Sequence, residues 1–96
     1  MSIIGFGTLK IEKEYRTKFE GLITLLITEM RKKKGCVQSY WSKSTETEGI
    51  YLMYSEFDNE ENFKNYRTSE LMDLINKQIV PLESGASFKY FRAELL

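Results

Sequence analysis

The chain has 96 residues, of which 42% are hydrophobic and 29% are charged, so it is long enough for one compact domain with its own core. We expect residues 1–96 to form that single domain. Fourteen basic residues balance fourteen acidic ones, and a net charge of zero disfavours nucleic acid and anionic membrane surfaces as partners. The sequence has no run of about 18 apolar residues and no signal-like N-terminus, which predicts a cytoplasmic protein.

The first predicted elements are a strand, a long helix and a hairpin. Residues 3–11 are rich in β-branched and aromatic types and predict a strand. Residues 12–34 predict a helix, because apolar side chains recur there at helical spacing. These side chains are Tyr15, Phe19, Leu22, Leu26 and Met30. Residues 36–43 and 50–57 predict two strands, joined by a polar turn.

The second half of the chain predicts another helix and a final strand. Asp58 and Glu61 have the spacing of a capping box, which predicts the start of a helix that reaches about Ser69. Ser69 can cap one or two further helical turns before Pro81, and residues 88–95 predict a fourth strand. The β-α-β-β-α-β order predicts a ferredoxin-like α+β sandwich, in which two helices cover one face of a four-stranded antiparallel sheet.

The last two predicted strands carry apolar side chains on both faces. Residues 50–54 are apolar or aromatic at every position, and Phe88, Tyr90, Phe91 and Ala93 also fall on both faces. A sheet with helices on one side and water on the other would alternate apolar and polar residues. We therefore expect the second face to pack against another copy in a two-fold homodimer. Scattered surface aromatics on a monomer are the alternative.

Two segments of the chain resemble one known family. Residues 35–40 (GCVQSY) follow a basic helix end, and residues 54–63 (YSEFDNEENF) lead into a helix with Ser69 a little later. These motifs resemble the antibiotic biosynthesis monooxygenase-like family of dimeric α/β barrels. The resemblance implies a homodimer whose sheets form a shared barrel, with a small-molecule pocket between the helices and the sheet of each subunit.

The chain contains no histidine, although many members of that family carry one at the position that resembles Tyr66. A tyrosine can donate and accept a hydrogen bond, but it does not titrate near neutral pH. Haem-degrading members have an Asn on the first strand, a Trp at the position of Tyr66 and a His at the position of Asn76, and this chain has none of the three. We therefore expect no haem chemistry.

We also expect neither another cofactor nor a metal ion. Without histidine, a metal site would depend on carboxylates such as Glu56 and Asp58, which better fit a capped helix start with solvated charges. The only cysteine, Cys36, has no histidine base and is expected to be a buried core residue.

Aromatic and hydroxyl side chains remain as candidates for an apolar pocket. The candidate ligand-binding residues are Trp41, Tyr51, Tyr54, Tyr66 and Tyr90, and the candidate catalytic residues are Tyr66, Trp41 and Arg92. A tyrosine or arginine can stabilise the anion that develops when a bound phenolate or enolate reacts with dioxygen. For each of these side chains, a place in the core or in a dimer interface is the alternative.

Two functions remain open. The first is a cofactor-independent monooxygenase that acts on a small aromatic or quinol-like metabolite. The alternative is a dimeric barrel that binds or isomerises a small apolar or aromatic ligand without oxidising it. Residues 49–57 also have a faint likeness to the third strand of an RNA-recognition motif, but Glu48 stands where that motif has a basic residue.

Overall fold

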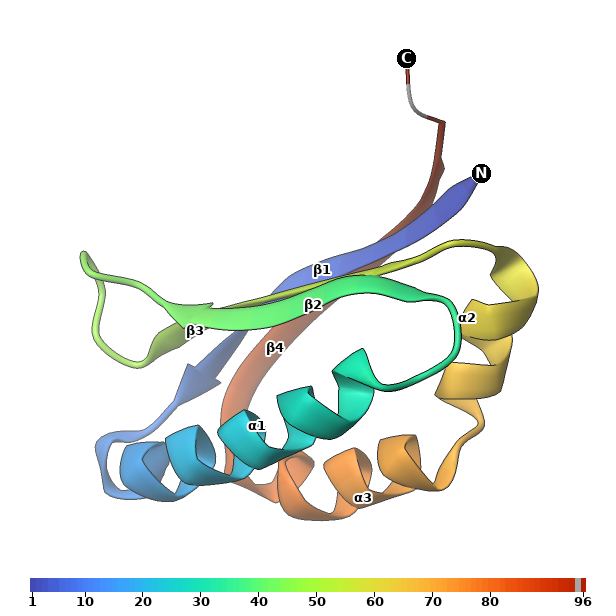
Figure 1. The fold of residues 1–96 in the computed structure, drawn as a ribbon. Coiled ribbons are helices and arrows are strands. Elements are labelled where there is room, and N and C mark those ends of the chain that lie inside the picture. The colour runs from blue at the N-terminus through green and yellow to red at the C-terminus, as the bar shows by residue number, and fades with distance from the viewer. Residues whose placement is uncertain (95) are drawn as a thin grey trace.

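The computed structural model describes residues 1–94 and 96, which form one sheet with the helices on one of its sides (Figure 1). The elements in chain order are β1 (Ser2–Ile11), the 3-10 turn η1 (Lys13–Tyr15), α1 (Arg16–Arg31), β2 (Cys36–Lys43), β3 (Ile50–Phe57), α2 (Glu60–Arg67), α3 (Glu70–Gln78), the 3-10 turn η2 (Val80–Leu82) and β4 (Glu83–Ala93). The strands are antiparallel, in the order β2-β3-β1-β4. The ferredoxin-like α+β fold predicted from the sequence is confirmed.

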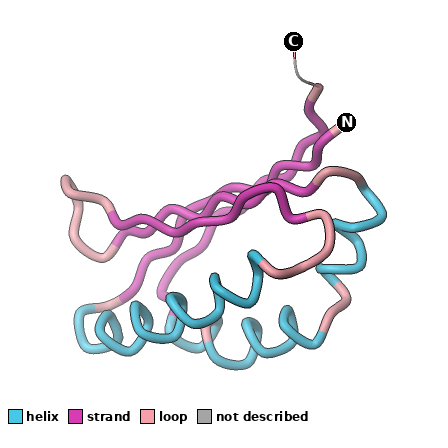
Figure 2. Tube along the Cα trace, viewed as in Figure 1, coloured by secondary structure: helices cyan, strands magenta, loops and turns pink. Residues whose placement is uncertain are grey.

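The molecule has two layers, a sheet and a layer of helices (Figure 2). Helices α1 and α3 lie beneath the sheet, and α2 lies at one of its ends (Figure 1). Strand β1 pairs with both β3 and β4. Among the described residues, no helix is both long and apolar enough to cross a membrane.

Helix α1 packs one apolar stripe against the sheet. Its buried side chains are Phe19, Ile23, Leu26, Ile27 and Met30. The predicted stripe contained Tyr15 and Leu22 in place of Ile23 and Ile27. This detail was wrong because the α-helix begins only at Arg16: Tyr15 lies in the preceding turn and is exposed, and Leu22 is only partly buried.

The predicted second helix ends at Arg67, and the further turns predicted after Ser69 form a separate helix, α3. Ser69 caps α3 as predicted, because its hydroxyl accepts a hydrogen bond from the backbone N–H of Met72. Helix α2 is capped by Asn59, whose side chain accepts from the N–H of Asn62 at 2.9 Å, and not by Asp58 as predicted. The Asp58 carboxylate accepts instead from the side-chain amide of Asn62 at 2.9 Å.

Strand β4 begins five residues earlier than predicted, at Glu83 instead of residue 88. Residues 83–87 (ESGAS) have little β propensity, so their pairing with β1 decides their conformation. Leu95, the last residue of the predicted strand, lies outside the described residues. Strand β4 is an edge strand, and it is exposed along most of its length.

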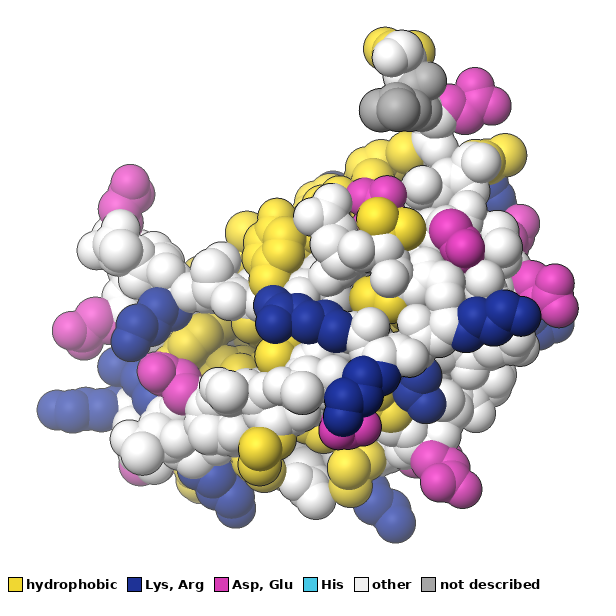
Figure 3. All heavy atoms as spheres, viewed as in Figure 1, with side chains coloured by type: hydrophobic (Ala, Val, Ile, Leu, Met, Phe, Trp, Pro, Cys, Tyr) yellow, Lys and Arg dark blue, Asp and Glu magenta, His cyan; other side chains and the backbone are white. Residues whose placement is uncertain are grey.

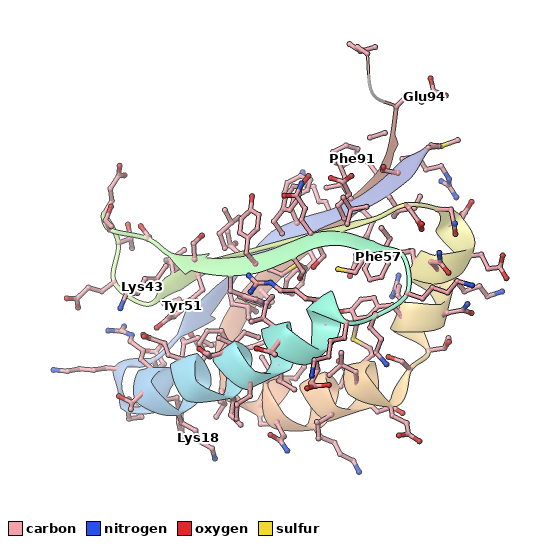
Figure 4. All side chains as sticks on the ribbon, viewed as in Figure 1. Lys18, Lys43, Tyr51, Phe57, Phe91 and Glu94 are labelled. Carbon is pink, nitrogen blue, oxygen red and sulfur yellow. The ribbon has the colours of Figure 1, made fainter. Side chains whose placement is uncertain are left out.

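The sheet has an inner face toward the helices and an outer face away from them. Tyr51 and Phe57 of β3 point toward the helices, whereas Phe91 of β4 points to the other side (Figure 4). The largest fully buried apolar side chains come from both layers: Leu9, Ile11, Phe19, Met30, Phe57 and Ile79. The outer face has no helix over it, so its apolar residues stay partly or fully exposed.

Candidate functional site

The main cavity lies between the helices and the inner face of the sheet. It has a volume of about 430 Å³, which is within the range of small-molecule sites. Aliphatic and thioether side chains form most of its wall: Leu9, Met30, Met53, Met72, Ile75 and Ile79. Phe88 and Tyr90 of β4 also line it and are 38% and 44% exposed, so the cavity opens along this edge strand.

Two glycines of β1 leave space for the aromatic rings of β4. Gly5 is the register partner of Tyr90, and Gly7 is the partner of Phe88. A Cβ atom at Gly5 would lie 2.7 Å from Cε1 of Tyr90, and one at Gly7 would collide with the ring of Phe88 and the backbone carbonyl of Ser87. The two rings therefore lie over the glycines, and this close approach sets the shape of the open side of the cavity.

The structure brings three of the predicted site residues together, because Trp41, Tyr66 and Tyr90 all line the main cavity. Tyr66 is only 7% exposed and stacks on Phe57, with ring centroids 5.0 Å apart. Burial, with a further contribution from Tyr90, raises the pKa of Tyr66 far above its usual value. No described residue forms a hydrogen bond with its hydroxyl, so Tyr66 brings a neutral, unpaired donor to an apolar cavity.

The indole of Trp41 separates the main cavity from a smaller hollow of about 160 Å³. The ring makes an edge contact with Phe19 at a centroid distance of 5.7 Å. Its Nε1–H is the one buried polar side-chain atom among the described residues that has no hydrogen-bond partner. An unpaired buried donor costs about 1–3 kcal/mol, so a ligand that supplied an acceptor here would gain affinity.

The other three predicted site residues lie outside the main cavity. Tyr51 faces the helices, but its hydroxyl donates to the carboxylate of Glu20 at 2.7 Å, beside the smaller hollow. Tyr54 lies on the outer face, where it stacks on another tyrosine. Arg92 forms an ion pair with Glu60 of α2. A ligand in the main cavity would therefore not contact these three side chains.

The pKa values of other groups are also shifted. Burial, together with the hydrogen bond to Glu20, raises the pKa of Tyr51 to about 12. The same hydrogen bond is the largest cause that lowers the pKa of Glu20. Cys36 is partly buried, and burial raises the pKa of its thiol. Within the described part of the chain, no group of three or more His, Cys, Asp or Glu side chains could hold a metal ion.

Two charged residues that line the main cavity were not predicted from the sequence. Arg67, the last residue of α2, has its guanidinium carbon 5.0 Å from the ring centroid of Tyr90 and 5.8 Å from that of Phe63. Glu83, the first residue of β4, also lines the cavity, and burial raises the pKa of its carboxyl. Arg67 directly follows the predicted site residue Tyr66, and this position could have indicated that Arg67 lies near the site. Glu83 gave no signal, because the start of β4 was not predicted.

Three solved structures illustrate the similarity of the fold. A conserved protein from Methanosarcina mazei Go1 has a TM-score of 0.89 and 19% identity, over 98% of this chain and 94% of that chain. A proposed antibiotic biosynthesis monooxygenase from Caulobacter crescentus CB15 has a TM-score of 0.90 and 19% identity, over 98% and 91%. A mutant of SnoaB, a cofactor-independent oxygenase from Streptomyces nogalater, has a TM-score of 0.86 and 9% identity, over 99% and 95%.

Identities this low show a shared fold and no more, and comparison with curated proteins gives no match. The sequence itself supplies the assignment. The family model described as antibiotic biosynthesis monooxygenase matches residues 3–78, which extend from the second residue of β1 to the end of α3. The chain therefore belongs to the antibiotic biosynthesis monooxygenase family.

Proposed function

We propose that the protein is a cofactor-independent monooxygenase that oxidises a small aromatic or quinol-like metabolite in the main cavity. Its family supports a monooxygenase, and a structural neighbour is named a cofactor-independent oxygenase. The observation that carries the proposal is the Tyr66 hydroxyl, a neutral donor that forms no hydrogen bond with any described residue and lies in a mostly apolar cavity.

The proposed reaction converts a phenol and dioxygen into a quinone and water. The electron-rich phenolate adds dioxygen at a ring carbon, and the resulting hydroperoxide loses water to leave a carbonyl group. One oxygen atom thus enters the product and the other leaves as water, so the substrate itself supplies the electrons. A hydrogen bond from Tyr66 would stabilise the negative charge that forms on the adding oxygen, and the apolar walls would keep bulk water away from it.

The test is oxygen uptake by the purified protein with a series of electron-rich phenols and quinols, corrected for uptake without protein. We expect uptake that depends on the protein and falls by about 10²-fold in Tyr66→Phe, a typical loss for one such donor. Phenylalanine keeps the stack on Phe57, so the fold is retained. Trp41→Phe removes the other unpaired donor and should also lower the rate.

The alternative is a protein that binds or isomerises an aromatic ligand without oxidising it. The same experiment separates the two functions. A ligand that binds and raises the melting temperature without oxygen uptake would support the alternative. Unchanged uptake in Tyr66→Phe would exclude the role proposed for this hydroxyl.

We also propose that two copies assemble through the outer face of the sheet. An outer aromatic face, made by Phe6, Tyr40, Leu52, Tyr54 and Phe91, crosses all four strands. Tyr40, Leu52 and Phe91 are 41%, 41% and 47% exposed, and Figure 3 shows hydrophobic side chains gathered on the side of the sheet away from the helices. Apolar surface of this kind is typical of an interface between copies.

The polar chemistry of this face also suits an interface. The carboxylate of Glu56 accepts hydrogen bonds from Ser2 at 3.3 Å, from Gln38 at 3.1 Å and from the hydroxyl of Tyr54 at 3.3 Å. An ionised carboxylate can be covered by a partner at lower cost when its oxygens already have donors. Two outer faces packed together would form the shared barrel that the fold family implies.

A further inference from the structure

We infer that the main cavity accepts an aromatic anion, namely a flat arene with one carboxylate or phenolate group, and that Arg67 selects this ligand by its charge. The inference rests on the proposed function only in that it takes the main cavity as the ligand site. It does not depend on whether the bound molecule is then oxidised.

Arg67 is the one arginine in the described part of the chain whose guanidinium has no acceptor. Arg16 donates to a backbone carbonyl at 2.9 Å, and Arg31 donates to another at 2.7 Å. Arg92 pairs with a glutamate of α2. Arg67 instead lies over the rings of Tyr90 and Phe63. Arg67 is an exposed residue that also lines this cavity, and a guanidinium that lies over rings in this way keeps its N–H groups available for a carboxylate or phenolate oxygen.

The distribution of charge along the cavity decides what Arg67 can bind. Arg67 and Glu83 are its only charged lining residues. Glu83 pairs with Ile11 of β1, whereas Tyr90, beneath Arg67, pairs with Gly5. Six residues of a strand correspond to roughly 20 Å between the two backbone positions, so Glu83 lies toward the other end of the cavity and is not paired with Arg67. One end of the cavity is therefore cationic.

The remaining walls match the aromatic part of such a ligand. Tyr66 lines the same cavity as Tyr90 and Arg67, so its hydroxyl can donate a second hydrogen bond to the same anionic group. Beyond these polar groups the wall contains the polar side chain of Asn76 and is otherwise mostly apolar, with Trp41 and Ile75 among its members. A volume of about 430 Å³ accommodates one or a few fused rings.

The test compares two probes of the same shape, 2-naphthoate and its neutral amide 2-naphthamide, by isothermal titration calorimetry. We expect the wild-type protein to bind the anion at least about tenfold more tightly than the amide, as a charge-assisted hydrogen bond predicts. In Arg67→Gln the preference should disappear while the affinity for the amide remains. Lys64→Gln, which removes an exposed cation from the same helix, is the matched control and should keep the preference.

The possible results have distinct meanings. Equal affinities in the wild type, or a preference that survives in Arg67→Gln, would overturn the inference and leave the monooxygenase proposal intact. If neither probe binds, the inference is overturned, and so is the assignment of the main cavity as the ligand site. A preference for the anion without oxygen uptake from any substrate would support the inference and contradict the proposed reaction. If Arg67→Gln does not fold, the preference for the anion is measured in Arg67→Lys and, for the wild type, at high salt. High salt screens the attraction between the cation and the ligand, so the preference of the wild type should fall there.

Discussion

At the scale of single residues, the most informative contact outside the cavity joins the sheet to helix α1. The buried Tyr51 ring packs on Phe19 at a centroid distance of 4.6 Å, and its hydroxyl donates to Glu20 at 2.7 Å. Lys43 lies 3.5 Å from the same carboxylate. The hydrogen bond lowers the pKa of Glu20, whereas burial together with this hydrogen bond raises the pKa of Tyr51. The stability of the protein should therefore depend on pH at this contact.

We predict that Tyr51→Phe destabilises the protein by about 1 kcal/mol near neutral pH, because it removes one hydrogen bond to a charged acceptor that is partly exposed. The melting temperature of a domain of this size should fall by roughly 4–8 °C. Thermal unfolding followed by circular dichroism between pH 3 and pH 12 measures the effect.

The pH dependence of this difference has a definite sign. The contribution of Glu20, whose folded pKa is lowered, is present above its usual pKa of 4.5 and is lost as the pH falls through the lower folded value. The contribution of Tyr51 to stability has the opposite dependence, because its pKa in the folded protein is raised. It is present below the usual tyrosine pKa of 10.0 and is lost as the pH rises toward about 12. The deficit of Tyr51→Phe should shrink at both extremes. A constant deficit would contradict this account, and Tyr15→Phe, at an exposed tyrosine, should show no deficit.

At the scale of secondary-structure elements, the pairing of β1 with β4 depends on glycine in β1. The space above Gly7 is filled by Phe88 and by the backbone of Ser87. An added methyl group at this position meets backbone atoms, which cannot move aside as the end of a flexible side chain would. Gly7 does not have a positive φ, so its backbone conformation does not require glycine. The contact requires glycine because no larger residue fits there.

We predict that Gly7→Ala destabilises the protein by about 3 kcal/mol, through overpacking between β1 and β4. Gly21→Ala is the matched control. Gly21 is an exposed residue of α1, and a Cβ atom there would have no neighbour within 4 Å, so alanine should stabilise the helix by about 1 kcal/mol. Chemical denaturation of both variants measures the two effects. A tolerated Gly7→Ala would show that the strands can separate at this point.

Much of the fold was predictable at this scale, because local patterns define most of the elements. The bounds predicted for β2 and β3 match the structure, since their apolar and aromatic runs are flanked by glycine and polar residues. The start of β4 and the cap of α2 were not predictable in the same way. The start of β4 depends on its pairing with β1, which is distant in the sequence. The cap of α2 depends on a choice between the adjacent residues Asp58 and Asn59.

The candidate site was predictable only in part, since a pocket depends on which side chains share a space. Alternation along β2 places Trp41 on the inner face, where it lines the cavity. Alternation also places Tyr54 on the outer face, but a list of candidate aromatics does not distinguish the faces. Arg67 and Glu83 come from the ends of two elements that meet only in the folded molecule.

At the scale of the whole molecule, the uncovered outer face determines the expected assembly. Strand β4 adds to this exposed surface, because it is exposed along most of its length and has a free edge. A free edge favours association with other chains unless a partner or a charged side chain blocks it. Assembly through the outer aromatic face would cover part of this surface.

We predict that the wild-type protein is a dimer in solution and that Leu52→Glu converts it to a monomer. The two-fold axis would place two buried carboxylates in one interface, which should weaken association by roughly 100-fold or more. Leu25→Glu is the matched control, because Leu25 is 68% exposed on α1, far from the outer face, and should leave the dimer unchanged. Light scattering coupled to gel filtration gives the masses. A monomeric wild type, or a dimer that survives Leu52→Glu, would contradict the assembly proposal.

The wall of the main cavity also affects how long such a catalyst would last. Three of the four methionines of the chain, Met30, Met53 and Met72, line this cavity. Flexible thioethers let a wall adapt to ligands of different outline. The same sulfur atoms are readily oxidised to sulfoxides, which are polar. Peroxide that escaped from the proposed reaction would meet these sulfur atoms first. The methionines that let the cavity adapt to its ligand could therefore also be oxidised during turnover, and the protein would gradually lose activity.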